Sequence, residues 1–295
     1  MTHHPIVLFP ANGMHPIAYT PLIQALNMPE PSRVPLSIDA AASPHPSQYI
    51  IYPPLQSPTP PVPNPLHWLH IWDAIQPQLQ WQEPCIGIGH SLGGTLLLYD
   101  AIKNPNRWSR IIIIEPALFS PFINKVYNIV QWSGLSRHIH PMVRLTKQRK
   151  ADFSDPDTVF ERWRPRSQFK YLSDTALRYF IEATLIKQSL TNLDTGSDFI
   201  EDTTLPYTLR FTKEWELEIY HSMCTLDPTI WRELPTLKPS LHTLAGAQSN
   251  TFLAGARKRL KKYSTQFITP PNTTHMLPFE DPDAICELIK TGSKP

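Results

Sequence analysis

The sequence predicts an α/β fold in which a mostly parallel sheet is flanked by helices. Short, continuous apolar runs, such as PIVLFP at 5–10 and SRIIIIEP at 109–116, are typical of strands buried on both faces. These runs alternate with stretches of helical spacing, and that alternation indicates a parallel sheet with helices on both sides. In such a sheet the ligand site is expected beyond the carboxyl ends of the strands.

The expected elements follow in order along the chain. Strands are predicted at 5–10, 48–54, 84–89, 109–116, 240–246 and 264–269. Helices are predicted at 17–26, 64–75, 92–103 and 252–263. A last helix is expected to begin with Asp281 as its N-cap and Pro282 at its first position, because both residue types are favoured there.

The strand–helix alternation stops after Pro116 and resumes near residue 240. Between them, residues from about 117 to 205 are rich in helix formers, aromatic residues and positive charge, and no strand-like run interrupts them. We therefore expect a core formed by 1–118 and 206–295, with a helical cap inserted at 119–205. Such a cap would lie over the carboxyl edge of the sheet.

Composition narrows the class of protein. The chain has 295 residues, of which 41% are hydrophobic and 18% charged, as in a folded protein with a substantial core. The formal net charge of +2 gives no sign of a general nucleic-acid-binding role. The three cysteines lie far apart and predict neither a disulfide framework nor a metal site: Cys85, Cys224 and Cys286.

Localisation and the loops are predicted from the same survey. No charged segment followed by a long apolar one opens the chain, and no run approaches 18 apolar residues, so we expect a cytoplasmic protein without stable membrane insertion. Of the 33 prolines, many lie between Pro29 and Pro65, where a rigid surface loop is expected and a proline-recognition ligand is the alternative. Basic residues of the cap, such as Arg144 and Lys147, are expected to form a solvated face. The alternative is that they attract an anionic substrate or a membrane surface.

The stretch IGIGHSLGG places a serine, Ser91, between Gly89 and Gly93 at the turn from a buried strand to a helix. This is the arrangement of a nucleophile elbow. The glycines leave room for a strained turn and close helix–strand packing. The N–H of Leu92, in the first turn of the helix, is free to stabilise an oxyanion. Ser91 is therefore the predicted nucleophile.

A serine nucleophile needs a general base and a second oxyanion donor. Among the 12 histidines, His275 lies between the last strand and the last helix, and it is the predicted base. The loop after the first strand, FPANGMHP, is expected to supply the second donor. The N–H of Met14 is the first choice, with Asn12 and Gly13 as alternatives. The candidates for the lining of the substrate pocket are Asn12, Gly13, His15 and His90. His15 can instead be a surface histidine, and His90 can instead pack beside the elbow.

The order of strand, oxyanion loop, elbow, cap and histidine loop resembles the α/β-hydrolase fold with a cap domain, across essentially the whole chain. Within it, PANGMHPIAYTPLIQAL, IIIIEPALF, YTLRFTKEWELEIY and GAQSNTF resemble a bacterial group of generic α/β-hydrolases. This resemblance implies a triad acid in the loop after the strand at 240–246. Asn250 stands there in place of an aspartate, and an amide cannot stabilise the imidazolium that forms during attack.

Glu115 is the alternative acid, because it ends the apolar strand that follows the elbow. A carboxylate buried there needs a partner, which His275 would supply. Glu115 is the favoured third member of the triad and Asn250 the alternative. The expected activity is hydrolysis of small carboxylic esters through an acyl-enzyme on Ser91, with no cofactor or metal implied. Thioester or carbon–carbon bond cleavage, perhydrolysis, and a non-catalytic ligand-binding role on the same fold stay open.

Overall fold

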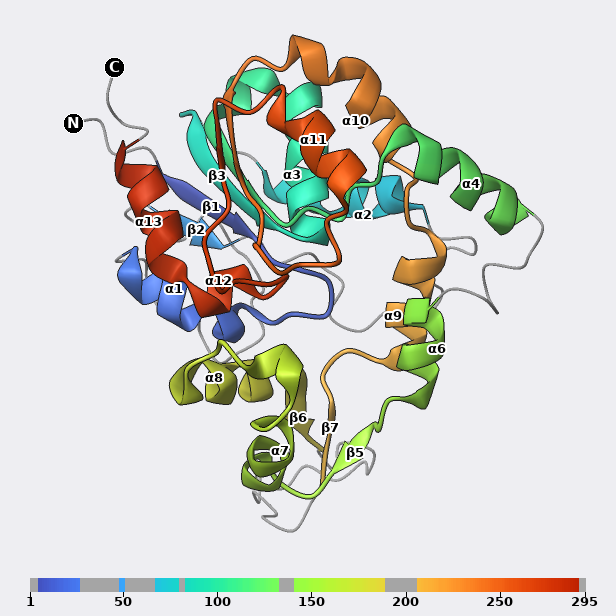
Figure 1. Cartoon of the computed structure of the whole chain (residues 1–295), viewed down its shortest axis with the longest axis vertical. Helices are drawn as coiled ribbons and strands as arrows, with labels where there is room; N and C mark the ends of the chain where they lie inside the picture. The colour runs from blue at the N-terminus through green and yellow to red at the C-terminus, as the bar shows by residue number, and fades with distance from the viewer. Residues whose placement is uncertain are drawn as a thin grey trace, which may run out of the picture.

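The computed structural model describes residues 5–26, 48–50, 67–79, 83–132, 141–188 and 206–291 (Figure 1). The proline-rich segment between Pro29 and Pro65, and its expected loop, therefore lie outside the described residues apart from 48–50. Residues 51–54 of the strand predicted at 48–54 also lie outside the described residues.

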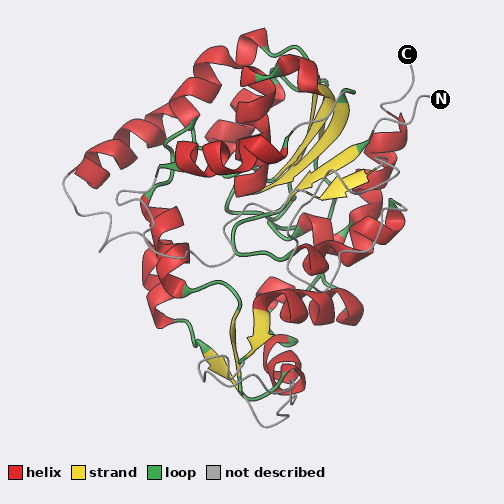
Figure 2. Ribbon diagram, turned by 180° about the vertical axis from the view of Figure 1, so that it is seen from behind, coloured by secondary structure: helices red, strands yellow, loops and turns green. Residues whose placement is uncertain are grey.

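A six-stranded sheet flanked by helices forms the core of the described chain (Figure 2). Its strand order is β2-β1-β3-β4-β8-β9. Every pairing in it is parallel. The strands are β1 (Ile6–Phe9), β2 (Gln48–Ile50), β3 (Cys85–His90), β4 (Trp108–Ile114), β8 (Ser240–Leu244) and β9 (Gln266–Ile268). This sheet confirms the mostly parallel sheet of the predicted α/β class.

Strand β4 shows why the apolar runs are continuous. Successive side chains of a strand point to opposite faces, and the four isoleucines of β4 divide accordingly. Ile112 and Ile114 belong to one buried cluster, with residues of α1 (Thr20–Ala25) and α13 (Pro282–Thr291). Ile111 and Ile113 belong to a second cluster, with residues of α2 (Trp68–Ile75), α3 (Leu92–Lys103) and α11 (Ala254–Lys261). Both faces of the sheet are therefore covered by helices.

Element boundaries agree closely with the sequence-based expectations in this core. Helix α3 begins and ends at the predicted residues. The backbone N–H of Ala284 donates to the Asp281 carboxylate at 3.1 Å, which confirms Asp281 as a cap of the last helix. A further short helix, α12 (Leu277–Glu280), precedes it.

The segment between β4 and β8 is not wholly helical, so the prediction of a helical cap is wrong in this respect. It holds α4 (Pro121–Trp132), α6 (Pro141–Gln148), α7 (Pro156–Trp163), α8 (Asp174–Thr184), α9 (Lys213–His221) and α10 (Asp227–Glu233). It also holds an antiparallel sheet of β5 (Asp152–Phe153), β7 (Tyr207–Leu209) and β6 (Leu185–Lys187), at the bottom of Figure 1. Runs of two or three residues are too short to show strand periodicity. The expected boundary at 205/206 also separates β7 from its partner strands.

A buried carboxylate joins three elements of the core. Asp100 in α3 is fully buried and accepts hydrogen bonds from the indole N–H groups of Trp72 (3.0 Å) and Trp108 (2.8 Å). The Arg107 guanidinium (2.6 Å) and the Asn104 amide (2.9 Å) also donate to it. One charge thus holds α2, α3 and the start of β4 together.

We expect Asp100→Leu to lower the free energy of unfolding by about 3–5 kcal/mol, because it removes a fully buried carboxylate that pairs with the half-buried Arg107 and accepts from two indole N–H groups. Urea unfolding, followed by tryptophan fluorescence, measures this change in the free energy of unfolding. Lys103→Ala is the matched control. It removes the 3.1 Å ion pair with Glu233, whose partners are about one-third exposed, and should cost less than about 1 kcal/mol. Equal losses for the two variants would contradict the role of Asp100.

Candidate active site

The turn between β3 and α3 holds Ser91 in a strained conformation. Its backbone has φ 53° and ψ −120°, a left-handed geometry that non-glycine residues adopt rarely and mostly at functional sites. The Ser91 N–H donates to the carbonyl of Ile114 at 3.0 Å, which ties the turn to the neighbouring strand β4. A side chain at Gly93 would overlap the backbone oxygens of Phe9 and Pro10. Glycine at 93 therefore lets α3 approach the loop after β1.

Three predicted residues from separate parts of the chain meet at this turn. Nε2 of His275 lies 3.1 Å from Oγ of Ser91, and its Nδ1 lies 3.1 Å from a carboxylate oxygen of Glu115. His275 comes from the loop between β9 and α12. Glu115 directly follows β4, has φ 47° and is fully buried. Asn250 is exposed, and Glu115 occupies the position that faces Nδ1 of His275.

The geometry determines which nitrogen of His275 carries a proton. An ionised carboxylate only accepts hydrogen bonds, so Nδ1 of His275 donates to Glu115. Nε2 then presents its lone pair to the Ser91 hydroxyl. This is the tautomer that a general base for serine requires.

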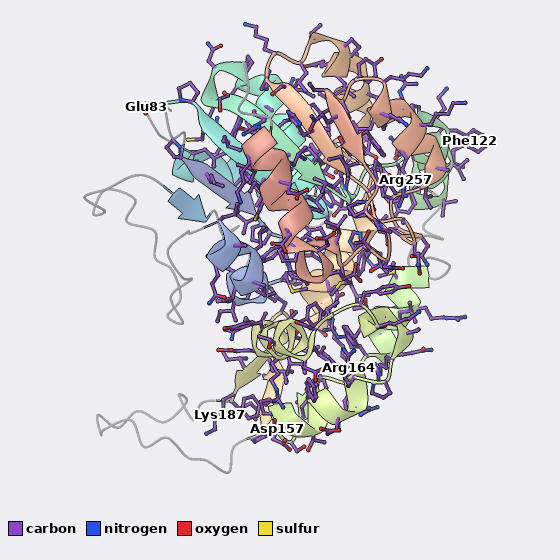
Figure 3. The ribbon with its side chains drawn as sticks, turned by 60° about the vertical axis from the view of Figure 1, so that its left-hand side comes forward. Glu83, Phe122, Asp157, Arg164, Lys187 and Arg257 are labelled. Atoms are coloured by element: carbon purple, nitrogen blue, oxygen red, sulfur yellow. The ribbon has the colours of Figure 1, made fainter. Side chains whose placement is uncertain are left out.

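Besides His275, the donors that hold the Glu115 carboxylate come from the loop that follows β8 and from α11. One oxygen accepts from the Gly246 N–H at 2.7 Å and from the Arg257 guanidinium at 3.2 Å. The other accepts from the Ser249 hydroxyl at 2.5 Å as well as from His275. Arg257 is only 20% exposed at its side chain and is labelled in Figure 3. These donors compensate for the burial of the charge.

The loop after β1 differs from the prediction for Met14. The Met14 N–H donates to the carbonyl of Ala11 at 3.2 Å, so the expected oxyanion donor is engaged within its own turn. Asn12 and Gly13 are the central residues of that turn, and Gly13 has φ 67°, as glycine permits. Within the described part of the chain, the buried side-chain oxygen of Asn12 has no hydrogen-bond partner.

His90 is buried, as expected for a ring that packs beside the elbow, and a place in the lining of the substrate pocket stays a prediction. Its Nε2 donates to the backbone carbonyl of His275 at 2.8 Å, since a carbonyl can only accept. Its Nδ1 therefore accepts from the Tyr19 hydroxyl at 2.8 Å, and the Tyr19 oxygen accepts from the Ala11 N–H at 2.8 Å. Burial, with the neighbouring His275, lowers the pKa of His90 well below its ordinary value. This keeps the ring neutral, as the bonding pattern requires.

His15 is also buried. Its Nδ1 accepts from the Ile17 N–H at 3.3 Å and caps the 3₁₀ helix Pro16–Tyr19. Burial, with a further contribution from Arg210, lowers the pKa of His15 to about 4. The structure thus assigns this ring a cap position, and a contact with substrate stays a prediction.

We expect Tyr19→Phe to lower the free energy of unfolding by about 1–3 kcal/mol, because the buried His90 Nδ1 and the half-buried Ala11 N–H both lose their partner. Chemical denaturation measures the change. Tyr171→Phe is the control, since it removes an exposed hydroxyl that bonds Gln248 at 2.9 Å, and we expect a change within about 0.5 kcal/mol. A Tyr19→Phe protein as stable as the wild type would contradict the proposed hydrogen-bond chain.

Sequence reasoning missed the residues that support the triad: Tyr19, Ser249, Arg257 and Glu280. Glu280 accepts from the Thr274 N–H at 2.6 Å and from its hydroxyl at 2.7 Å, which holds the histidine loop. Arg257 lies in the basic run RKRLKK, which predicts a solvated helix face. No local pattern distinguishes these side chains, because each acts across a long separation or within an irregular loop.

The described ranges hold neither of two other kinds of feature, a metal-ligating cluster and a membrane-spanning helix. No three His, Cys, Asp or Glu side chains converge there as a metal ion requires. No described helix combines the length and apolar character needed to cross a membrane.

Comparison with known proteins identifies the fold family. A sequence model of the alpha/beta hydrolase family matches residues 6–288, and no curated protein matches significantly. The structure resembles Lpx1, the peroxisomal alpha-beta-hydrolase of Saccharomyces cerevisiae, at 15% identity and a TM-score of 0.61, over 99% of this chain and 77% of that one.

Two further solved structures have the same fold. The thioesterase domain from the curacin biosynthetic pathway is 15% identical, with a TM-score of 0.59 over 97% of this chain and 91% of that one. A carboxylesterase structure from the thaumarchaeon Nitrososphaera gargenis is 12% identical, with a TM-score of 0.60 over 99% and 90%. Since the family match extends over nearly the whole sequence, this chain belongs to the alpha/beta hydrolase family.

Proposed function

We propose that this protein is a serine hydrolase that cleaves carboxylic esters, with Ser91 as nucleophile, His275 as general base and Glu115 as the acid that orients it. The observation that carries the proposal is the continuous hydrogen-bond chain from Ser91 Oγ through both nitrogens of His275 to the buried Glu115 carboxylate. Esterases among the solved structures of this fold support the choice of an ester substrate.

The proposed reaction has two halves. Ser91 Oγ attacks the ester carbonyl carbon while Nε2 of His275 takes the hydroxyl proton. The alcohol leaves with that proton, and the acyl group remains on Ser91. A water molecule then attacks the acyl carbon while His275 takes one of its protons. The bond between the acyl carbon and Ser91 Oγ breaks, His275 returns the proton to Oγ, and the carboxylic acid is released.

The oxyanion of each step needs two donors. Leu92 is the first residue of α3, and N–H groups in a first helical turn have no carbonyl partner within the helix. We assign the second donor to the turn centred on Asn12 and Gly13 in place of Met14, whose N–H is engaged by Ala11. Gly93 brings this loop against the start of α3, which supports the pairing of these donors.

Active-site labelling tests the proposal. The folded protein is incubated with a fluorophosphonate and analysed by intact-mass spectrometry and peptide mapping. We expect one adduct, on Ser91, and none in Ser91→Ala or in urea-unfolded protein. A folded wild-type protein that remains unlabelled would favour the alternative of a non-catalytic ligand-binding protein.

Turnover distinguishes the hydrolytic chemistries. A panel of p-nitrophenyl acyl esters and matched acyl thioesters is compared by kcat/KM. The proposal expects the esters to be the better substrates. Preference for thioesters, or labelling of Ser91 without turnover of either class, would replace the ester assignment while leaving the nucleophile in place.

A further inference from the structure

Exposed apolar side chains gather on two helices outside the candidate active site. Among the described residues, seven large apolar side chains are exposed, and five of them lie on α4 and α6. The five are Phe122 (76% exposed), Val126 (46%), Ile129 (67%), Met142 (41%) and Leu145 (57%). Single exposed apolar residues are ordinary, but a cluster indicates an interaction surface.

The cluster follows the geometry of the helices. Phe122, Val126 and Ile129 are four and three positions apart, so they form one stripe along α4. The opposite side of α4 is packed: Asn124 is buried, and the Tyr127 hydroxyl donates to the carbonyl of Tyr220 at 2.6 Å. Helix α4 therefore has one face in the protein and one apolar face outside it.

Helix α6 has the same division. Val143 and Thr146 are buried, and the helix packs on α9. Met142 and Leu145 point outward. Both views of the chain place α4 and α6 along one flank (Figures 1 and 2), and Phe122 lies at the outer edge of the molecule (Figure 3). We call the exposed residues of α4 and α6, together with the exposed Lys150 just after α6, the apolar–basic surface.

The charge of this surface is one-sided. Residues 121–132 and 141–150 contain five lysines or arginines and no aspartate or glutamate, although the whole chain has a formal net charge of only +2. Lys125 lies beside the stripe, and Arg144, Lys147 and Lys150 are exposed. On the adjacent α9, Glu216 is paired with Arg149 at 3.0 Å, while Glu214 is exposed.

We infer that the apolar–basic surface binds the surface of an anionic lipid bilayer. Apolar side chains along a helix with lysine and arginine beside them are the composition of a helix that lies in the membrane interface. An acidic protein would also complement the charge. The stripe on α4 lies at the outer edge of the molecule, exposes phenylalanine and isoleucine side chains, and has only one charged residue beside it. This composition favours insertion among lipids over pairing with carboxylates. The inference does not depend on the proposed hydrolase activity.

Vesicle co-sedimentation of the full chain tests it, with Ser91→Ala as the background so that hydrolysis plays no part. We expect binding to phosphatidylcholine vesicles containing phosphatidylglycerol, weaker binding to phosphatidylcholine alone, and release at high salt. The double variant Phe122→Ser/Ile129→Ser should reduce the partition coefficient about tenfold or more. Lys125→Glu and Lys147→Glu should each reduce it by about fivefold or more.

Matched controls lie elsewhere on the chain. Ile186→Ser and Leu253→Ser replace the two remaining large apolar residues that are exposed in the described part of the chain. Lys258→Glu makes the same charge change on α11. All three should bind like the parent, and circular dichroism should show every variant folded. The inference is overturned if the Ser91→Ala parent does not bind anionic vesicles. It is also overturned if the control variants lose as much binding as Phe122→Ser/Ile129→Ser does.

Two other occupants have distinct signatures, and either one would overturn the inference. Concentration-dependent dimerisation in sedimentation velocity, abolished by Phe122→Ser/Ile129→Ser without any vesicle binding, would assign the face to a second copy of this chain. Binding to soluble polyglutamate that depends on Lys125 and Lys147 but not on Phe122 and Ile129 would assign it to an acidic protein.

Discussion

Ser91→Ala and His275→Ala are each expected to reduce kcat for the best ester substrate by about 10⁵–10⁶, and the double variant should be no slower than either single one. The two residues act as a unit, because the base is useless without the hydroxyl and the hydroxyl is a poor nucleophile without the base. Activity that remains would come from the oxyanion donors and from substrate binding. Initial rates of purified proteins, normalised to the wild type, measure this.

The controls separate this effect from general damage. Ser109→Ala removes a hydroxyl that donates to the carbonyl of Cys85, and His70→Ala removes an exposed ring; both should retain activity. If the losses in the two single variants multiply in the double variant, Ser91 and His275 act independently, and the proposed triad is wrong.

Glu115→Gln is expected to lower kcat by about 10³–10⁴ while leaving KM for a neutral ester nearly unchanged. A neutral amide neither holds the Nδ1 proton of His275 as a carboxylate does nor stabilises the imidazolium of the transition state. Asn250→Ala should change kcat little, since Asn250 is exposed on the loop. Steady-state kinetics of both variants measure the contrast.

This experiment needs a control for the loss of a buried charge. Glu216→Gln removes a glutamate that pairs with an arginine at 3.0 Å outside the site, and its kcat should match that of the wild type. Because Glu115 also pairs with Arg257, the folded, competent fraction of Glu115→Gln is counted by prolonged fluorophosphonate titration. Two outcomes would contradict the assignment of Glu115 as the triad acid. In one, the lower kcat of Glu115→Gln is explained entirely by its unfolded fraction. In the other, Asn250→Ala loses more kcat than Glu115→Gln.

The sequence patterns predict the helices and strands of the core more closely than those of the segment between β4 and β8. The elements of the central sheet are strongly marked, as in IIIIEP and in GHSLGG followed by a helix, because burial on both faces demands uninterrupted apolar runs. The strands of the small sheet are two or three residues long, and their pairing depends on residues far apart in the chain. No window of local sequence carries that information.

The candidate site shows the same division. Ser91 and His275 are recognisable because their place relative to strands and helices is visible in the sequence. The choice between Glu115 and Asn250 is not, because both follow strands whose ends meet at the same edge of the sheet. The structure places Glu115 against His275 and surrounds its carboxylate with Gly246, Ser249 and Arg257. Asn250, the residue directly after Ser249, is exposed and is not among these partners.

The sequence by itself therefore determined the α/β class, the elbow and the late histidine, because each depends on local periodicity and on order along the chain. Only the tertiary structure decided which side chain meets Nδ1 of His275, that the Met14 N–H is engaged by Ala11, and that Arg257 turns inward. These facts depend on distances between groups as many as 160 residues apart. Such distances are set by the packing of both faces of the sheet, which a one-dimensional pattern does not contain.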